Sequence, residues 1–198
     1  MTVALQKLSF AEYRAYSDHS DCRYELVEGE LTPMSVGTGL HGAIAKFLER
    51  SFDNEISRLG LPWTAQKFTV GVQSPRGGRW DTSRIPDVTV LTQSQWETLA
   101  QREAIITLDQ PPPLLVAEVV SESTRTTDYR SKRSEYAVLG IPEYWLVDSA
   151  EQKVMICSLV EGFYDEATFT NGAVLVSPTF PGLNLTAEEV LRVKVEGR

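Results

Sequence analysis

A continuous apolar run near the middle of the chain constrains its fold most strongly. The run is LLVAEVV, residues 114–120, and its only charged residue is Glu118. A strand that is almost entirely apolar is typical of a sheet covered on both faces by helices. A helical pattern over about 128–139 follows, Gly140 stops it, and EYWLVD at 143–148 indicates a second buried strand. Strand, helix and strand in this order predict a crossover unit with parallel strand pairing.

The segments on either side of this unit predict an α/β domain with an antiparallel extension. Before it, the patterns predict a helix over 10–17, a hairpin at 24–31, a long helix over 41–59 ended by Gly60, strands at 65–73 and 85–91, and a short helix that begins with a capping box at 94–97. After it, they predict a meander of short strands over 153–177 and a final helix that begins with a capping box at 186–189. The prediction is one domain over 1–198, with its core at about 24–148 and a C-terminal β extension at about 150–198.

Composition narrows the class of protein further. With 198 residues, of which 42% are hydrophobic, the chain is long enough to bury a substantial core. Its 19 Lys and Arg against 27 Asp and Glu give a net charge of −8, which argues against a protein that coats DNA non-specifically. No apolar run approaches the ~20 residues of a membrane helix, and the N-terminus shows no signal peptide. Cys22 and Cys157 have no metal-cage spacing, so we expect reduced thiols and a cytoplasmic protein.

Several common catalytic motifs are missing, which excludes their chemistry. The sequence contains no GxxxxGK[ST], no GxGxxG after a strand, no GxSxG and no HExxH, so phosphate-loop, dinucleotide-binding and hydrolase-elbow sites lack support. His19 and His41 are the two histidines of the chain, so a histidine-rich metal site is excluded as well. Carboxylates are the groups that remain for catalysis.

Two acidic residues lie where strands are predicted. Asp87 follows Pro86 at the start of a predicted strand, and Glu118 lies inside the apolar run. An ionised carboxylate in a buried strand is costly unless a cation or hydrogen-bond donors meet it. If adjacent strands bring the two acids together, a divalent ion that prefers hard oxygen ligands, such as Mg²⁺, relieves their repulsion. Lys132, one turn into the next helix, is then placed to orient a water or to stabilise charge on a phosphate.

Each of these residues also has a purely structural interpretation. An Asp after Pro is usually a turn or cap residue, and a single helical lysine such as Lys132 is most often a solvated surface group. Glu118 differs from both, because a lone acid among six apolar strand residues needs an explanation. The order of strand acid, strand acid and helix lysine favours the functional interpretation of the three together.

Five motifs together resemble the Uma2 family, also called DUF820, of the PD-(D/E)XK restriction-endonuclease-like superfamily. They are YELVEGEL, the helix that begins at His41, RIPDVTVL, LLVAEVVSESTRTTDYRSKRSEYAVLG and IPEYWLVD, and they cover most of 24–148. The resemblance implies a restriction-endonuclease-like mixed sheet flanked by helices, with an N-terminal hairpin and a C-terminal antiparallel extension. It also implies a phosphodiesterase site that depends on Mg²⁺ or Mn²⁺.

The resemblance further implies roles for individual residues. Asp87 matches the Asp of the motif and Glu118 matches its second acid, which makes these two the implied metal ligands. The superfamily lysine normally stands two residues after that acid, where this chain has Val120. The family pattern instead has a lysine on the next helix, which is Lys132 here, so the implied catalytic lysine has migrated.

Glu25 and His41 are secondary candidates, because both match the family pattern. Either would add a metal ligand or contact a phosphate. The structural alternatives are a hairpin pair for Glu25 and a helix-start residue, satisfied by backbone, for His41. Simpler interpretations fit the neighbouring residues: helix capping for Ser121, Ser123, Thr124 and Asp128, and packing for Tyr136 and Trp145.

Two functions from different classes follow from these observations. The first is an endonuclease that hydrolyses DNA phosphodiester bonds with the two acids and the migrated lysine. The second is a catalytically inactive nuclease-like module that binds a nucleic acid or a protein, and Val120 favours it; a small-molecule hydrolase on the same acids is a third. The expected partners are DNA, a divalent metal and a second copy in a homodimer, with no membrane. Positive charge within 76–84 and 125–133 predicts a locally basic mouth around the site.

Overall fold

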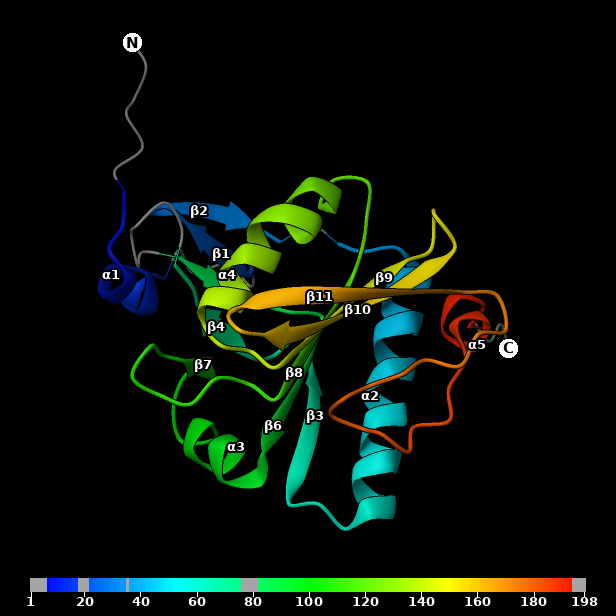
Figure 1. Cartoon of the computed structure of the whole chain (residues 1–198). Coiled ribbons are helices and arrows are strands. Elements are labelled where there is room, and N and C mark those ends of the chain that lie inside the picture. Colours follow the sequence, from blue (N-terminus) through cyan, green and yellow to red (C-terminus); the bar gives the residue numbers. More distant parts are fainter. Residues whose placement is uncertain (1–6, 18–21, 35, 76–81, 194–198) are drawn as a thin grey trace.

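The computed structural model describes residues 7–17, 22–34, 36–75 and 82–193, and its elements form two β-sheets flanked by helices (Figure 1). The strands are β1 (Tyr24–Val27), β2 (Glu30–Pro33), β3 (Trp63–Lys67), β4 (Gly71–Gln73), β5 (Ser83–Arg84), β6 (Val88–Thr92), β7 (Ile105–Ile106), β8 (Leu115–Val119), β9 (Glu143–Asp148), β10 (Lys153–Val160) and β11 (Phe163–Thr170). The helices are α1 (Phe10–Ala15), α2 (Gly39–Leu59), α3 (Gln93–Leu99), α4 (Arg133–Val138) and α5 (Ala187–Leu191), and a π-helical turn, η1 (Thr127–Lys132), runs directly into α4.

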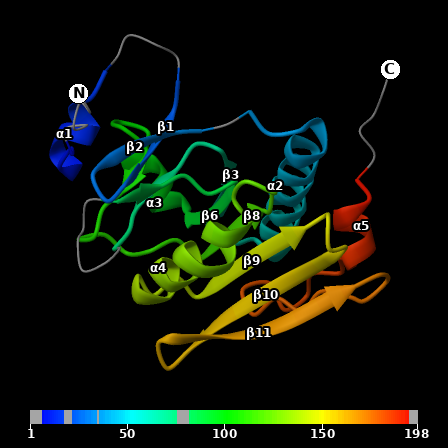
Figure 2. The ribbon, with the colours of Figure 1, turned by 90° about the horizontal axis from the view of Figure 1, so that it is seen from above.

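Both sheets are mixed. The larger one has the strand order β11-β10-β9-β8-β6-β3, and the smaller one has β2-β1-β5-β4-β7. In the larger sheet β8 and β9 pair in parallel, with Glu118 opposite Leu146, while the other neighbours pair antiparallel. The helical segment η1–α4 connects β8 to β9, which confirms the predicted crossover unit. Near the two ends of the chain, α1 and α5 lie on opposite sides of the molecule (Figure 2).

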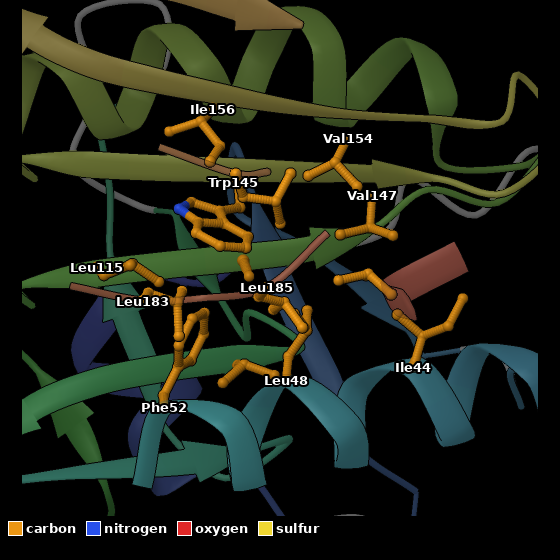
Figure 3. Packing of buried hydrophobic residues seen from close by; sticks show 14 of the residues in the cluster. Ile44, Leu48, Phe52, Leu115, Trp145, Val147, Val154, Ile156, Leu183 and Leu185 are labelled. Carbon is orange, nitrogen blue, oxygen red and sulfur yellow. The ribbon is translucent and has the colours of Figure 1, made fainter. Parts of the chain in front are cut away.

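Helix α2 covers one face of the larger sheet and builds the main core. Thr38 caps its N-terminus by accepting the N–H of His41, and Gly60, with φ of 64°, ends it in the left-handed conformation. Figure 3 shows α2 side chains directed at the strands. The ring of Phe52 meets Trp145 edge-on at 5.2 Å and stacks on Phe180 at 5.5 Å. Such aromatic contacts add to the burial of large apolar surface and so fix α2 against the sheet.

The C-terminal segment contributes to the same core. Leu183 and Leu185 pack in the cluster with α2 (Figure 3). The buried carboxylate of Glu143, on β9, holds this segment in place: it accepts hydrogen bonds from the Ser177 hydroxyl and the Thr179 N–H, each at 2.7 Å. These contacts support the single-domain prediction, which stays a prediction.

Three predicted elements differ in the structure. The strand expected at 65–73 is two strands in different sheets, β3 and β4, because Phe68 between them has a φ of 53° and breaks the extended backbone. The last strand of the meander is absent among the described residues, and 173–177 contributes one isolated bridge, Val174 to Thr186. The capping box of α3 is Thr92 with Gln95, two residues earlier than predicted. None of the helices in the described part of the chain is long and apolar enough to cross a bilayer.

The two cysteines give a first testable prediction. Neither forms a disulfide; Cys22 is exposed, whereas burial raises the pKa of the Cys157 thiol to about 12. At pH 8 only about one Cys157 thiol in 10⁴ is then ionised. A chromogenic disulfide reagent should therefore modify one thiol per native chain and two per unfolded chain. A Cys22→Ser variant should lose the rapid native reaction; rapid native modification of Cys157 would contradict the packing around β10.

Candidate active site

Asp87 and Glu118 meet where the β6–β8 ladder ends. Val88 pairs with Ala117, so Asp87, one residue earlier, falls opposite Glu118. The N–H of Val119 donates to Asp87 Oδ2 at 2.6 Å and ties Asp87 to β8. Both side chains are almost fully buried, with residue exposures of 7% for Asp87 and 3% for Glu118. The structure therefore brings the two predicted acids together.

Within β8, alternation decides which way Glu118 faces. Leu115, Ala117 and Val119 pack into the main core with α2. Glu118 therefore belongs to the opposite face, where Val116 packs with the aromatic residues of α4 and β9 in a second cluster. The acid thus faces the helical segment that carries the predicted lysine.

Lys132 reaches this pair from η1. Its Nζ lies 2.8 Å from Glu118 Oε1, 3.1 Å from Asp128 Oδ1 and 3.9 Å from Glu25 Oε1, and the residue is 5% exposed. The π-helical turn was not predicted, although such turns are frequent at functional sites. Lys132 and Asp128 are the two buried residues of this turn.

Asp128 and Tyr136 make contacts in the site that the sequence did not predict. Asp128 is not a helix cap: it lies inside η1, 1% exposed, and pairs with Lys132. The Tyr136 hydroxyl donates to Glu118 Oε1 at 2.9 Å, and the Tyr144 hydroxyl donates to the Asp128 carbonyl at 3.1 Å. The i,i+4 spacing of Asp128 and Lys132 is a signal in the sequence that was compatible with this pairing.

Burial and mutual attraction set the ionisation of these groups. Burial raises the pKa of Glu118 well above its usual value; the charge of Lys132 opposes this shift and the charge of Asp87 adds to it. Burial also disfavours the ammonium of Lys132, but Glu118 and the other carboxylates around it overcome this and raise its pKa. Lys132 is therefore protonated at neutral pH. In the metal-free protein it can therefore donate hydrogen bonds and supply positive charge.

His41 lies at the edge of the site, where α2 begins. Its Nε2 is 3.0 Å from Asp87 Oδ1, and its ring stacks on Phe68 at 5.9 Å between centroids. The hydrogen bond with Asp87 is the main cause of a raised His41 pKa. The interpretation of His41 as a helix-start residue satisfied by backbone is therefore incomplete, since its N–H does bond Thr38 but its ring bonds the predicted metal ligand.

Glu25 approaches from the smaller sheet. Its Oε1 accepts the N–H of Ile85 at 3.1 Å, and its Oε2 accepts a hydrogen bond from Arg84 at 3.0 Å. The same Oε1 is the atom that lies 3.9 Å from Lys132. Both secondary candidates therefore border the central three residues: Glu25 lies beside Lys132 and His41 beside Asp87. Their roles in a reaction stay predictions.

The loop after Glu118 carries a reciprocal pair of bonds between Ser121 and Thr124, whereas η1 itself has no side-chain cap. The N–H of Ser121 donates to the Thr124 hydroxyl at 3.1 Å, and the N–H of Thr124 donates to the Ser121 hydroxyl at 3.2 Å. The Ser121 hydroxyl also lies 3.1 Å from that of Ser123. These reciprocal bonds account for the three hydroxyl groups without a ligand.

The predicted basic mouth is not found among the described residues. Most cations of the two segments are paired with acids: Arg84 with Glu135 and Glu25, Arg125 with Asp148, Lys132 with Glu118 and Asp128, and Arg133 with Glu166. Arg84 and Lys132 are also buried, while Arg130 is exposed. Arg76 and Arg79 lie outside the described residues. The count of charges along the sequence was correct, but each of these paired cations meets a carboxylate, and Arg125 and Arg133 stay partly exposed.

The donor set fits a hard divalent cation. Five carboxyl groups (Glu25, Asp87, Glu118, Asp128 and Glu135) surround the cations Arg84 and Lys132 and the imidazole of His41, which pairs with Asp87. This excess of negative charge in a buried region favours a further cation. Within the described ranges, no cluster of three or more His, Cys, Asp and Glu side chains is arranged to hold a metal ion. Asp87 and Glu118 are the two acids that could share an ion, with water and phosphate oxygens completing its shell as in many Mg²⁺ sites.

The His41–Asp87 pair predicts a pH-dependent contribution to stability. The pKa of His41 is raised in the folded protein, so the attraction is fully present below the unfolded value of about 6.5 and is lost as pH rises through the folded value. In metal-free protein, His41→Leu should reduce the free energy of unfolding by about 1 kcal/mol or less at pH 6. The difference from the parent should shrink by pH 9 in urea titrations. A difference that stays constant over this range would contradict a charged His41–Asp87 pair.

Comparisons with known proteins identify the family and the fold of the chain. The model of the Uma2 family, described as "Putative restriction endonuclease", matches residues 10–188. A crystal structure titled a putative nuclease belonging to DUF820, from Anabaena variabilis ATCC 29413, superposes with a TM-score of 0.73 at 19% identity, covering 93% of this chain and 97% of that one. No curated protein gives a significant match. The structural likeness confirms the predicted fold class, a restriction-endonuclease-like α/β fold.

Proposed function

The chain belongs to the Uma2 family, and from this membership and the geometry of its site we propose that it is a divalent-metal-dependent endonuclease of DNA. The observation that carries the proposal is the buried contact of Lys132 with Glu118, directly opposite Asp87 on the neighbouring strand. Burying charged side chains this close together costs folding free energy. Clusters of this kind are frequent at catalytic sites. The proposed reaction is hydrolysis of a phosphodiester bond with Mg²⁺ or Mn²⁺.

Asp87 and Glu118 would hold the ion. A bound ion of this type polarises the phosphate and lowers the pKa of water in its coordination shell. The carboxylate of Asp87 is already oriented, because the Val119 N–H bonds one of its oxygens and the His41 ring bonds the other. The Tyr136 hydroxyl orients Glu118 in the same way. Side chains held by such hydrogen bonds lose little freedom when they coordinate a ligand.

Lys132 would act as a cation, because its ammonium lies among carboxylates, 2.8 Å from Glu118 and 3.1 Å from Asp128. If Glu118 were to bind a metal ion, Asp128, 3.1 Å from the Lys132 ammonium, would still pair with it. The ammonium is then available to stabilise the charge that develops on the phosphate during attack by water. Glu25 lies on its other side and limits its movement.

The function is tested by incubating supercoiled plasmid DNA with the protein and Mg²⁺ or Mn²⁺, with EDTA as the control. We expect nicked or linear DNA with either ion and none with EDTA. A calorimetric titration with Mn²⁺ distinguishes the alternatives. Metal binding without cleavage would favour the inactive nuclease-like module. Two features favour that alternative: Lys132 already pairs with Glu118, and Val120 stands where the superfamily has its lysine. Absence of binding at millimolar Mn²⁺, with the fold intact, would reject the metal-dependent enzyme.

A further inference from the structure

Arg84 is a buried charge that the proposed reaction does not use. It belongs to β5, is 1% exposed, and ranks among the largest fully buried side chains of the described residues. Its Nε and Nη2 donate to the two oxygens of Glu135 at 2.8 and 2.9 Å, and its Nη1 donates to Glu25 Oε2 at 3.0 Å. Glu135, on α4, is 3% exposed. One guanidinium thus connects a strand, a second strand and a helix.

Three charge contacts, together with the helical backbone that joins Lys132 to Glu135, form a ring that includes the proposed catalytic lysine. Lys132 faces Glu25, Glu25 bonds Arg84, and Arg84 bonds Glu135. Glu135 stands three residues after Lys132 on one continuous helical segment, so the two side chains share a face. The ring therefore joins the segment that carries Lys132 to the strands of the smaller sheet.

The same arginine is linked to the metal-binding side of the site through the backbone. Asp87 stands three residues after Arg84, and Pro86 between them has a restricted backbone. The Ile85 N–H, next to Arg84, donates to Glu25 Oε1. Movement of Arg84 would thus be transmitted to Asp87 on one side and to Lys132 on the other.

We propose that Arg84 is a positioning residue, which together with Glu135 fixes the distance between Lys132 and the acids of the site. The proposal rests on the proposed nuclease function. An arginine suits this task, because its planar fork holds a carboxylate in one orientation by two parallel bonds. Stability alone does not explain the pair, since well-packed apolar residues of similar volume often stabilise a protein as well as a buried ion pair.

This distinction allows the proposal to be tested in a folded protein. The double variant Arg84→Met/Glu135→Leu removes both charges and keeps the buried volume. Arg133→Met is the matched control, because Arg133 lies on the same helix but pairs with Glu166 of β11, outside the ring. Thermal unfolding and calorimetric Mn²⁺ binding first establish that each variant is folded and binds metal like the parent.

Two further readouts decide the outcome. The first, which does not depend on nuclease activity, is acetylation of Lys132 in the metal-free protein, measured by mass spectrometry against the exposed Lys46. The second is the split of plasmid cleavage into kcat and KM. We expect Lys132 of the double variant to be acetylated about tenfold faster, and kcat to fall about 100-fold with KM within about twofold of the parent. The control should match the parent in both.

Parental values of either readout in the folded double variant would overturn the proposal. If the double variant does not fold, Glu135→Gln, which keeps the shape of the side chain and removes its charge, is judged by the same two criteria. If the parent itself does not cleave DNA, the nuclease function fails, whereas the acetylation of Lys132 still tests whether Arg84 positions it.

Discussion

Glu118→Gln and Asp87→Asn should each lower the rate of plasmid nicking by about 10³-fold or more, because an amide cannot supply the negative charge that holds a divalent ion. Both variants should remain folded. Asparagine at 87 keeps an oxygen for the Val119 N–H, and glutamine at 118 is neutral at a position where burial disfavours charge. We therefore expect Glu118→Gln to unfold cooperatively in metal-free buffer, with Lys132 still paired to Asp128.

The matched control for this pair is Glu122→Gln, which removes a carboxylate from an exposed position in the loop that follows Glu118. It should cleave at the parental rate. Loss of Mn²⁺ binding should accompany the loss of cleavage in the two site variants and not in the control. Cleavage by either site variant at the parental rate would show that the observed activity comes from a contaminant or another site.

Lys132→Met should affect both activity and stability. Cleavage should fall by at least about 10²-fold, because the cation that stabilises the phosphate is lost. In metal-free protein at pH 8, the free energy of unfolding should fall by about 3 kcal/mol, because Glu118 and Asp128 remain buried without their cation. Lys46→Met, at an exposed position of α2, should change neither quantity.

The stability loss of Lys132→Met should depend on pH in a defined direction. Burial raises the pKa of both Glu118 and Asp128 above the unfolded values, and removing the lysine raises them further. The folded variant then binds more protons than the unfolded chain, so its stability increases as pH falls from 8 to 5. Adding Asp128→Asn should recover part of the stability and none of the cleavage. A loss that is equal at pH 5 and pH 8 in urea titrations would contradict the buried ion pairs.

Much of the fold could be predicted from the sequence, because it depends on local patterns. The apolar run at 114–120, the stop at Gly140 and the apolar strand at 143–148 identified the crossover unit, which the parallel β8–β9 pairing confirms. Gly60 and the Glu28-Gly29 turn were recognisable since glycine adopts positive φ readily. The structure also brings together Asp87, Glu118 and Lys132, the residues that the family motifs singled out.

The unpredicted parts depend on contacts between distant segments. A π-helical turn is too short to leave a recognisable hydrophobic pattern in the sequence. The sequence therefore did not predict η1, in which Asp128 and Lys132 are buried. Tyr136 looked like a packing residue, and its hydroxyl finds Glu118 only because α4 lies over β8. Arg84 counted as a surface cation because its partner Glu135 is far away in the sequence.

If Asp87 and Glu118 form a divalent metal site, anomalous diffraction from crystals containing Mn²⁺ should show it. We expect an anomalous peak in contact with oxygens of both carboxylates, with Lys132 still bonded to Asp128. No peak at these residues in fully occupied, well-ordered crystals, or a peak held by other side chains, would contradict it.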